Sequence, residues 1–239
     1  MMARAFLRHF VEGYLFGDLD TMTAASAQAT ADVGRLGYPI FMSCSAGIEL
    51  LGMLVSAEPI TRQSGGHDGP HAPRTNFARF WTNYLYPNDR ARRDAANAVF
   101  QLIRNGVAHT FVAKDWDIKV DGEHLKRTGD TPRLNAVQLA TDLKNAYAEF
   151  VHVLDGVTKK TDHDAASIEL RVAEFLQLNA RTAEAQQHRD AIGALPESPP
   201  TLAFGQGGTL GQTTFHPPEG AVSSGSYSYT LSLLPKTKP

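Results

Sequence analysis

Residues 39–56, PIFMSCSAGIELLGMLVS, are the stretch of the chain that decides the fold. Apolar side chains recur on nearly every side of the helix that these residues favour, and Pro39 suits its first turn. A helix that is apolar almost all round is typical of the centre of a bundle. The stretch is long enough to cross a membrane, but Glu49 near its middle would be costly in lipid. We therefore predict a buried core helix in a protein that does not associate with a membrane.

Helical spacing of apolar residues continues on both sides of this stretch. Residues 58–74 interrupt it with many Gly and Pro residues, which indicates a loop. The spacing predicts further helices over residues 2–17, 20–33, 75–86, 90–104, 134–154 and 165–192. The sequence therefore predicts a mainly α-helical protein that is built as a helical bundle.

The pattern changes from helical to alternating after residue 109. Residues 110–112 and 116–120 alternate as strands do, and Asp121-Gly122 is typical of a hairpin turn before residues 124–126. We therefore expect a short β-hairpin between the helix at residues 90–104 and the helix at residues 134–154.

A shift in composition divides the chain near residue 195. Residues 1–194 are predicted to form one helical domain with its core over about residues 38–155. Residues 195–239 are rich in Pro, Gly, Ser and Thr, which favours an extended C-terminal tail. Within this tail, residues 226–234 (SYSYTLSLL) alternate and are a candidate strand.

Charge and cysteine content limit the classes of function. The formal net charge of −2 argues against a broadly basic coat for nucleic acid, although it leaves room for a small phosphate site. Cys44 is the only cysteine, so no internal disulfide can form. The first residues also lack the long apolar segment of a secretory signal. We therefore expect a cytoplasmic protein.

The sequence Arg104-Asn105-Gly106-Val107-Ala108-His109 closes the helix predicted over residues 90–104. Arg104 carries a permanent charge and a planar fork of donors that suits phosphate oxygens. Histidine has an unperturbed pKa of about 6.5, so His109 is a candidate acid or base near neutral pH. Asn105 lies four residues before His109 and can orient it if the helix continues. These three residues are the candidate catalytic groups.

The spacing of this pair sets a geometric condition. Residues five apart on an unbroken α-helix point about 140° away from each other, at roughly 100° per residue. Arg104 and His109 would then diverge. Gly106 is the residue at which the helix can stop or bend. We therefore expect a break at Gly106.

Residues 104–109 resemble the Arg-x4-His signature of the HEPN superfamily. Residues 47–52, GIELLG, are similar to an apolar helix of bacterial HEPN-like sequences. The resemblance covers mainly residues 38–109, and the helix at residues 134–154 completes a plausible four-helix unit. It implies a metal-independent endoribonuclease with no cofactor, in which the 2′-hydroxyl of RNA attacks the adjacent phosphate. It also implies a homodimer that brings two motifs together, a role in defence or as a toxin, and an antitoxin or regulatory protein as a candidate partner.

Glu49 is the candidate orienting residue. A lone carboxylate in the most apolar helix is expensive, so Glu49 is expected to have a partner. In the functional interpretation it accepts a hydrogen bond from Arg104 or His109 and fixes the direction of that side chain. In the alternative it forms a purely structural pair with another residue.

Arg90, Arg92 and Arg93 begin the helix that carries the motif. They are candidate contacts for the RNA backbone, and the alternative is a solvated basic face. His67 and His71 also lie four apart, but the Gly-Pro between them prevents the helix that would bring them together as metal ligands. We therefore expect a loop and no metal there.

Three other interpretations compete with a ribonuclease. In the first, residues 104–109 are only a helix end, where Arg favours the dipole, Asn-Gly stops the helix and His caps carbonyls. In the second, the chain is a non-catalytic HEPN-like module that binds a protein or a nucleotide. In the third, it is a structural dimer whose tail mediates interaction.

Overall fold

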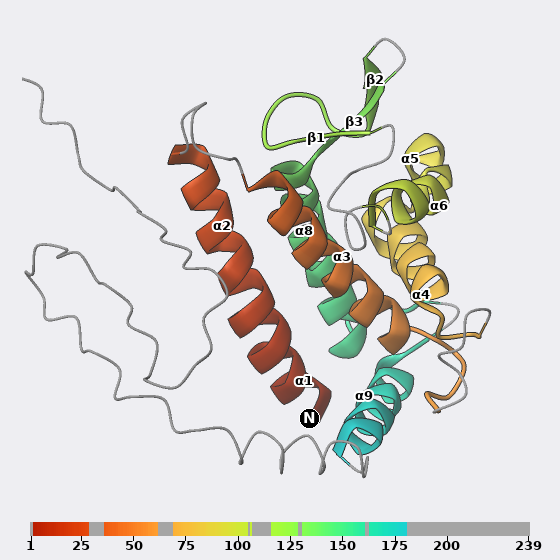
Figure 1. Ribbon diagram of the computed structural model, residues 1–239. Helices are drawn as coiled ribbons and strands as arrows, with labels where there is room; N and C mark the ends of the chain where they lie inside the picture. The colour runs from red at the N-terminus through yellow and green to blue at the C-terminus, as the bar shows by residue number, and fades with distance from the viewer. Residues whose placement is uncertain are drawn as a thin grey trace, which may run out of the picture. The chain divides into compact units, whose positions relative to one another are not determined.

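The computed structural model describes residues 2–28, 36–61, 69–104, 106, 116–128, 131–160 and 163–180. Contacts divide the chain into two units, residues 1–193 and 194–239, and every described residue belongs to the first. The described part is a helical bundle with a small β-sheet, as the sequence predicts (Figure 1). The predicted tail over residues 195–239 lies outside the described residues.

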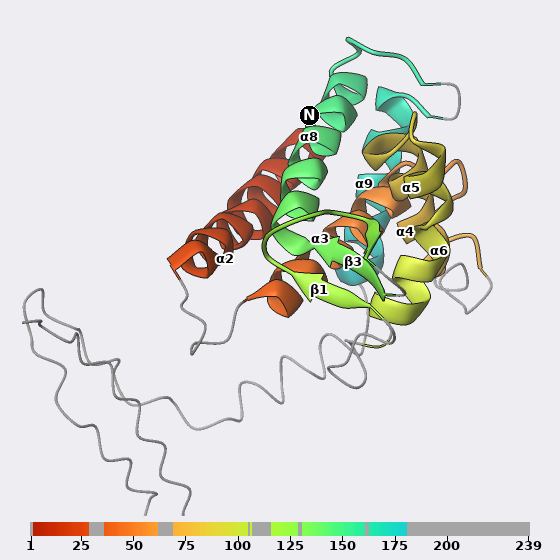
Figure 2. The same cartoon turned by 90° about the horizontal axis from the view of Figure 1, so that it is seen from above.

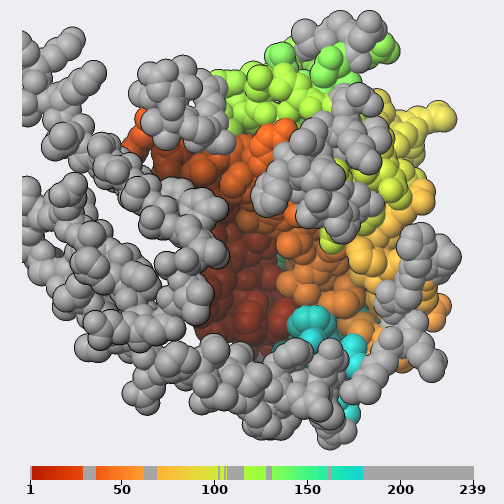
Figure 3. Space-filling model, in the orientation of Figure 1, coloured from red at the N-terminus to blue at the C-terminus, as the bar shows by residue number. Residues whose placement is uncertain are grey.

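The chain begins with a continuous helical rod of three segments. α1 (Met2–Phe6) passes into the π-helical stretch η1 (Leu7–Phe16), which passes into α2 (Gly17–Gln28). Phe6 and Gly17, at the two junctions, both keep the right-handed helical backbone. The sequence predicted two helices with a gap at residues 18 and 19, but the helix runs through them. Figure 3 shows this rod in dark red, with α9 in cyan at its N-terminal end.

α3 (Gly37–Leu54) occupies the centre of the bundle, as predicted (Figures 1 and 2). It packs against the first rod, α4 (Pro73–Phe80), α8 (Ala136–Leu154) and α9 (Ala165–Ala180). Among the described helices, α3 is the one with the length and hydropathy of a membrane span, and 56% of that segment is buried inside the bundle. Its fully buried apolar side chains are Ile40, Phe41, Cys44, Ile48, Leu51 and Leu54.

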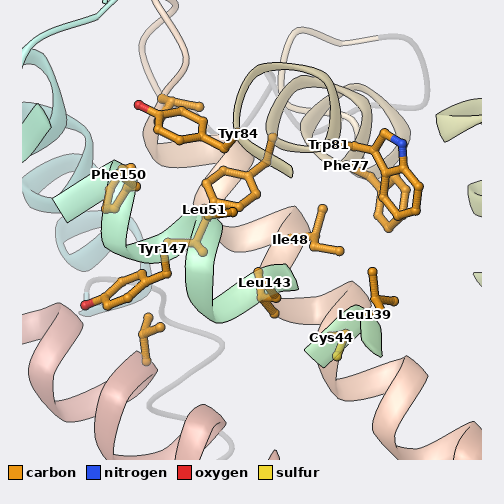
Figure 4. Packing of buried hydrophobic residues seen from close by; sticks show 14 of the residues in the cluster. Cys44, Ile48, Leu51, Phe77, Trp81, Tyr84, Leu139, Leu143, Tyr147 and Phe150 are labelled. Carbon is orange, nitrogen blue, oxygen red and sulfur yellow. The ribbon is translucent and has the colours of Figure 1, made fainter. Parts of the chain in front are cut away.

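An aromatic cluster fills the core beside α3 (Figure 4). The rings of Phe77 and Trp81 are stacked with centroids 5.2 Å apart, and Phe80 stacks on Tyr84 at 4.9 Å. Phe150 of α8 meets Tyr84 edge-on. The helical spacing of these residues indicated core packing instead of a surface for stacking bases, and their burial confirms it.

Two glycines set how closely α3 meets its neighbours. A Cβ atom at Gly52 would lie 1.9 Å from the carbonyl oxygen of Asn76, so only glycine allows α4 to approach. Arg79 also donates from Nη1 to the carbonyl oxygen of Gly52 at 2.9 Å. A Cβ atom at Gly47 would meet only side-chain atoms, the end of Leu15 at 2.5 Å and Leu143 Cδ2 at 3.4 Å. The GIELLG segment is therefore a packing element as well as the carrier of Glu49.

The β-sheet has three strands in the order β1-β3-β2. β2 (Lys126–Thr128) and β3 (Thr131–Asn135) pair antiparallel. The hairpin predicted between residues 116–120 and 124–126 is wrong, because β1 and β2 are not neighbours in the sheet. β1 (Asp117–Lys119) pairs with β3 in parallel, although the sequence predicted β1 as one arm of the hairpin. The glycine of Asp121-Gly122 does turn the chain, with a φ of 75°, but the turn leads to β2 as a separate strand. The expected strand at residues 110–112 lies outside the described residues.

The helix predicted over residues 90–104 is present as three consecutive segments. These are α5 (Arg90–Asp94), α6 (Ala96–Ala98) and the π-helical stretch η3 (Val99–Arg104). A further π-helical stretch, η2 (Trp81–Leu85), continues α4. The sequence did not predict π-helix, because apolar spacing over one turn suits a period of 3.6 residues or a wider one equally well.

Candidate functional site

Arg104 and Glu49 form a two-point ion pair that joins η3 to α3. Arg104 Nε donates to Glu49 Oε1 at 2.7 Å, and Nη2 donates to Oε2 at 3.1 Å. The two side chains are 25% and 16% exposed, so the pair lies at the edge of the core. Two parallel charge-assisted bonds fix the plane of the guanidinium as well as its position. The predicted hydrogen bond from Arg104 to Glu49 is therefore observed.

The ion pair does not use every donor of the guanidinium. Nε and Nη2 face Glu49, whereas Nη1 makes no hydrogen bond with any residue that the structure describes. The Arg104 Cζ atom stands 5.4 Å from the centroid of the Phe100 ring, which supports the guanidinium from one side. The two N–H groups of Nη1 can thus bind an anion while Glu49 prevents the group from rotating.

The helical segment that carries Arg104, η3, is a π-helix. In a π-helix the N–H of residue i+5 bonds to the carbonyl of residue i, so residues five apart follow one another along one face. The π-helical stretch ends at Arg104, so this spacing applies to residues 99–104. Gly106, where we expected the helix to stop, is itself helical and buried. Asn105 and His109 lie outside the described residues.

The three arginines predicted to contact an RNA backbone stand apart from this pair. Arg90 is 88% exposed, and its Nε lies 3.6 Å from Asp94 Oδ2. Arg92 Nε lies 3.4 Å from Asp89 Oδ2. Arg93 occupies the same turn at the start of α5, whereas the ion pair lies at the end of η3. A rise of about 1.5 Å per residue puts about 15 Å of helix between them, and their contact with an RNA backbone stays a prediction.

A second polar cluster, which the sequence did not reveal, lies at the C-terminal end of η2 and joins three elements. We name it the Tyr86–His124–Asp142 network. The hydroxyl of Tyr86 donates to Asp142 Oδ2 at 2.7 Å and lies 2.8 Å from His124 Nε2. The backbone N–H of Asn135 donates to His124 Nδ1 at 3.2 Å. The side chains of His124 and Asp142 are 4% and 17% exposed, so the network is enclosed.

The hydrogen bonds of this network determine its proton positions. Because Nδ1 of His124 accepts from the backbone, the ring proton of the neutral imidazole is on Nε2 and is donated to the Tyr86 oxygen. Tyr86 in turn donates its own proton to Asp142. Each donor thus faces an acceptor, and neither ring nitrogen is left for a substrate. The network fastens the sheet segment to α8 and to the end of η2.

Burial keeps both neutral members of the network uncharged near neutral pH. Burial lowers the pKa of His124 from 6.5 to about 4, and the attraction of Asp142 opposes this shift without cancelling it. Burial raises the pKa of the Tyr86 hydroxyl far above its usual range, and the negative charge of Asp142 raises it further. Both groups are therefore held in their neutral forms near neutral pH.

No sequence signal marked the network in advance. Tyr86 follows a run of aromatic core residues, and His124 was assigned to a predicted strand. Asp142 lies on a helix whose apolar stripe gave no reason to single it out. The three residues meet only because β3 passes directly into α8 and brings the backbone of Asn135 to the imidazole.

His71, which the sequence placed in a loop, uses its ring in packing the chain. His71 Nε2 lies 2.9 Å and 3.1 Å from the carbonyl oxygens of Glu58 and Pro59. Its sequence neighbour His67 lies outside the described residues. Within the part of the chain that the structure describes, no three His, Cys, Asp or Glu side chains gather as the ligands of a metal ion would.

Comparison of the chain with models of known protein families, with curated proteins and with solved structures finds no match.

Proposed function

We propose that the chain is a HEPN-type, metal-independent endoribonuclease in which Arg104 and His109 act on the phosphate and Glu49 orients Arg104. The observation that supports this proposal most is the contact between the two segments that carry the resemblance. Glu49 of GIELLG and Arg104 of RNGVAH are 55 residues apart in the chain, yet they bind each other at two points. A purely local helix end would not require a carboxylate from α3.

The proposed reaction needs a phosphate-binding cation and two proton transfers. A base removes the proton of the RNA 2′-hydroxyl, and the 2′-oxygen forms a bond to the adjacent phosphorus. The bond from phosphorus to the 5′-oxygen breaks, and an acid gives that oxygen a proton. The products are a 2′,3′-cyclic phosphate and a free 5′-hydroxyl, so no metal or cofactor is consumed.

Arg104 is suited to the charge that develops on the phosphate oxygens. The ion pair holds its guanidinium in place before substrate arrives, and Nη1 keeps two donors for the anion. Donors that are fixed in advance stabilise a transition state without a reorganisation cost, and losing one lowers the rate about 10²- to 10³-fold. His109 supplies a proton-transfer group, because imidazole titrates near neutral pH.

A single protomer offers one such histidine, whereas the reaction needs two proton transfers. We therefore propose a homodimer in which two copies of the Arg104–His109 motif face one cleft. This arrangement predicts that the activity per protomer falls when the protein is diluted below the concentration at which it dimerises.

The direct test is RNA cleavage by the full-length protein in excess EDTA, with analysis of the product ends. Wild type is expected to leave 2′,3′-cyclic phosphate ends, His109→Ala to lose cleavage, and Arg104→Lys to lose about 10²-fold because lysine lacks the planar fork. Lys126→Ala is the matched control, since it removes an exposed positive charge from β2, which carries no residue of the proposed site. Cleavage by His109→Ala at the wild-type rate would refute the proposal.

A further inference from the structure

The outer face of the first helical rod carries aromatic rings that are about half exposed. Phe10 and Tyr14 are 48% and 58% exposed, in contrast to the buried aromatic cluster beside α3. Their rings are stacked, with centroids 6.3 Å apart and an interplanar angle of 29°. The ring of His9 stands edge-on to both, at 4.7 Å from Phe10 and 5.0 Å from Tyr14. The three rings form a pre-arranged aromatic surface.

The π-helical geometry of η1 places a cation and an open hollow beside these rings. Residues five apart are neighbours along a π-helix, so Arg8 stands one turn from Gly13, and His9 one turn from Tyr14. Gly13 has no side chain, and an open hollow of about 480 Å³ lies between Arg8, His9 and Tyr14. The hollow therefore has an aromatic wall and a positively charged wall.

Arg8 carries the one positive charge of this surface that is not neutralised by a described residue. It makes no hydrogen bond or ion pair within the described part of the chain. Arg4, one turn earlier, is bound to Asp155 at 2.9 Å and lies 3.7 Å from Glu12. Glu12 itself accepts from Tyr147 at 2.8 Å. The local field beside Phe10 and Tyr14 is thus set by Arg8.

A neighbouring hollow is lined partly by negatively charged side chains. It measures about 630 Å³ and also borders Arg8, but Asp155 and Glu169 line it as well. Carboxylates repel a phosphate, so an anionic chain is favoured only on the side of Arg8 that faces Tyr14. Asp18, which is exposed and one helical turn beyond Tyr14, limits the surface at its other end.

We infer that this surface, formed by Arg8, His9, Phe10 and Tyr14, binds single-stranded RNA by stacking bases on the two rings and holding a backbone phosphate with Arg8. This inference rests on the proposed function for the choice of RNA as the partner. Aromatic rings accept any base, because every base has a flat face, and an adjacent arginine holds the chain. The surface would retain substrate independently of the Arg104 site, on a separate element.

The test measures binding of a short single-stranded 2′-O-methyl RNA to the full-length protein by fluorescence anisotropy. This probe has no free 2′-hydroxyl, so its binding does not depend on cleavage. Tyr14→Ala and Phe10→Ala are each expected to weaken binding about tenfold, and Tyr14→Phe to leave it near the wild-type value. Arg8→Ala is expected to reduce the slope of the logarithm of affinity against the logarithm of salt by about 0.7.

Two matched variants show whether such losses are specific. Leu170→Ala removes a comparably exposed apolar side chain from α9, and Lys126→Ala removes an exposed charge from β2. Both are expected to bind as wild type does. Circular dichroism melting of each variant shows that the bundle is intact.

The outcomes separate this inference from the proposed function. Binding that is lost in Tyr14→Ala but not in Leu170→Ala supports the surface, even if wild type cuts no RNA at all. Equal binding by Tyr14→Ala and wild type, or no binding by wild type, overturns it, even if cleavage is observed. A change of oligomeric state in Tyr14→Ala, with RNA affinity unchanged, would show instead that the rings contact a second copy.

Discussion

The Arg104–Glu49 pair and the Tyr86–His124–Asp142 network are two polar contacts in one apolar bundle, yet they differ in what they leave unsatisfied. In the network each donor of the two rings meets an acceptor, and burial holds both rings neutral. In the pair a permanent cation is fixed at the edge of the core with Nη1 still unbound by any described residue.

This difference distinguishes a contact that fastens the fold from one that can also act on a ligand. A network in which every donor already has an acceptor offers no hydrogen-bond donor to a substrate. A cation that is oriented by one carboxylate and partly exposed can bind an anion without moving. We therefore expect changes in the network to alter stability alone, and changes in the pair to alter activity more than stability.

The substitution with the largest expected effect on the free energy of unfolding disturbs both regions together. α3 carries Glu49, and α4 leads through η2 to Tyr86, so the contact of Gly52 with Asn76 supports both. Gly52→Ala is expected to cost more than about 3 kcal/mol of unfolding free energy, because its Cβ meets backbone that cannot move aside. Chemical denaturation measures this cost. Gly47→Ala is the control and is expected to cost less, since the flexible end of Leu15 can shift.

His124→Ala breaks the network while leaving the pair untouched. It removes the acceptor of the Asn135 N–H and the donor to Tyr86, and it leaves a cavity. We expect a loss of about 3 kcal/mol in unfolding free energy. The cleavage rate per folded molecule should stay at the wild-type value. A selective loss of cleavage in this variant, with stability retained, would mean that the network belongs to the site.

Glu49→Gln is expected to lower the cleavage rate more than the stability. Glutamine keeps the shape of the side chain but replaces one carboxylate oxygen with a donor that faces Arg104. We expect a stability loss of only about 1 kcal/mol, because the pair is partly exposed to water. The cleavage rate is expected to fall about tenfold or more, because the guanidinium is no longer fixed. Stability and cleavage are measured on the same preparation.

A pH dependence of the free energy of unfolding also belongs to the network. The pKa of His124 is about 4 in the folded chain and 6.5 as a free side chain, so the unfolded chain binds the proton more readily between these values. The stability from the neutral imidazole is full above pH 6.5 and is lost as the pH falls toward 4. His124→Gln has no imidazole to titrate. The difference in unfolding free energy between wild type and this variant should therefore shrink over that range, and a constant difference would contradict the assignment.

The sequence predicted the elements whose signal is carried by apolar spacing. The central position of α3 followed from apolar residues on nearly all its sides, and the helix at residues 134–154 followed from its stripe, although it begins at Ala136. The sheet order could not be predicted, because β1 pairs with β3, although β2 lies between them in the sequence and no short turn joins them. The π-helical stretches were missed because apolar spacing over about one turn fits a period of 3.6 residues or a wider one equally well.

Within the candidate site, the sequence predicted only the contact that follows from a charged residue in an apolar helix. A carboxylate in an apolar helix needs a partner, and Arg104 is that partner. The three arginines at the start of α5 show the limit of this reasoning, because a basic run in the sequence says nothing of the acidic side chains beside it. The rings of Phe10 and Tyr14 look like core residues by spacing, and only the structure shows that they are about half exposed.

The most direct test of the account compares Arg104→Ala with the double variant Arg104→Ala/Glu49→Ala. The single variant leaves Glu49 unpaired at the edge of the core, and the double variant removes that unpaired charge. We predict that the double variant regains most of the lost unfolding free energy but cleaves RNA no faster than the single variant does. If cleavage returns together with stability, the pair only fastens α3 to η3, and the proposed catalytic role of Arg104 is wrong.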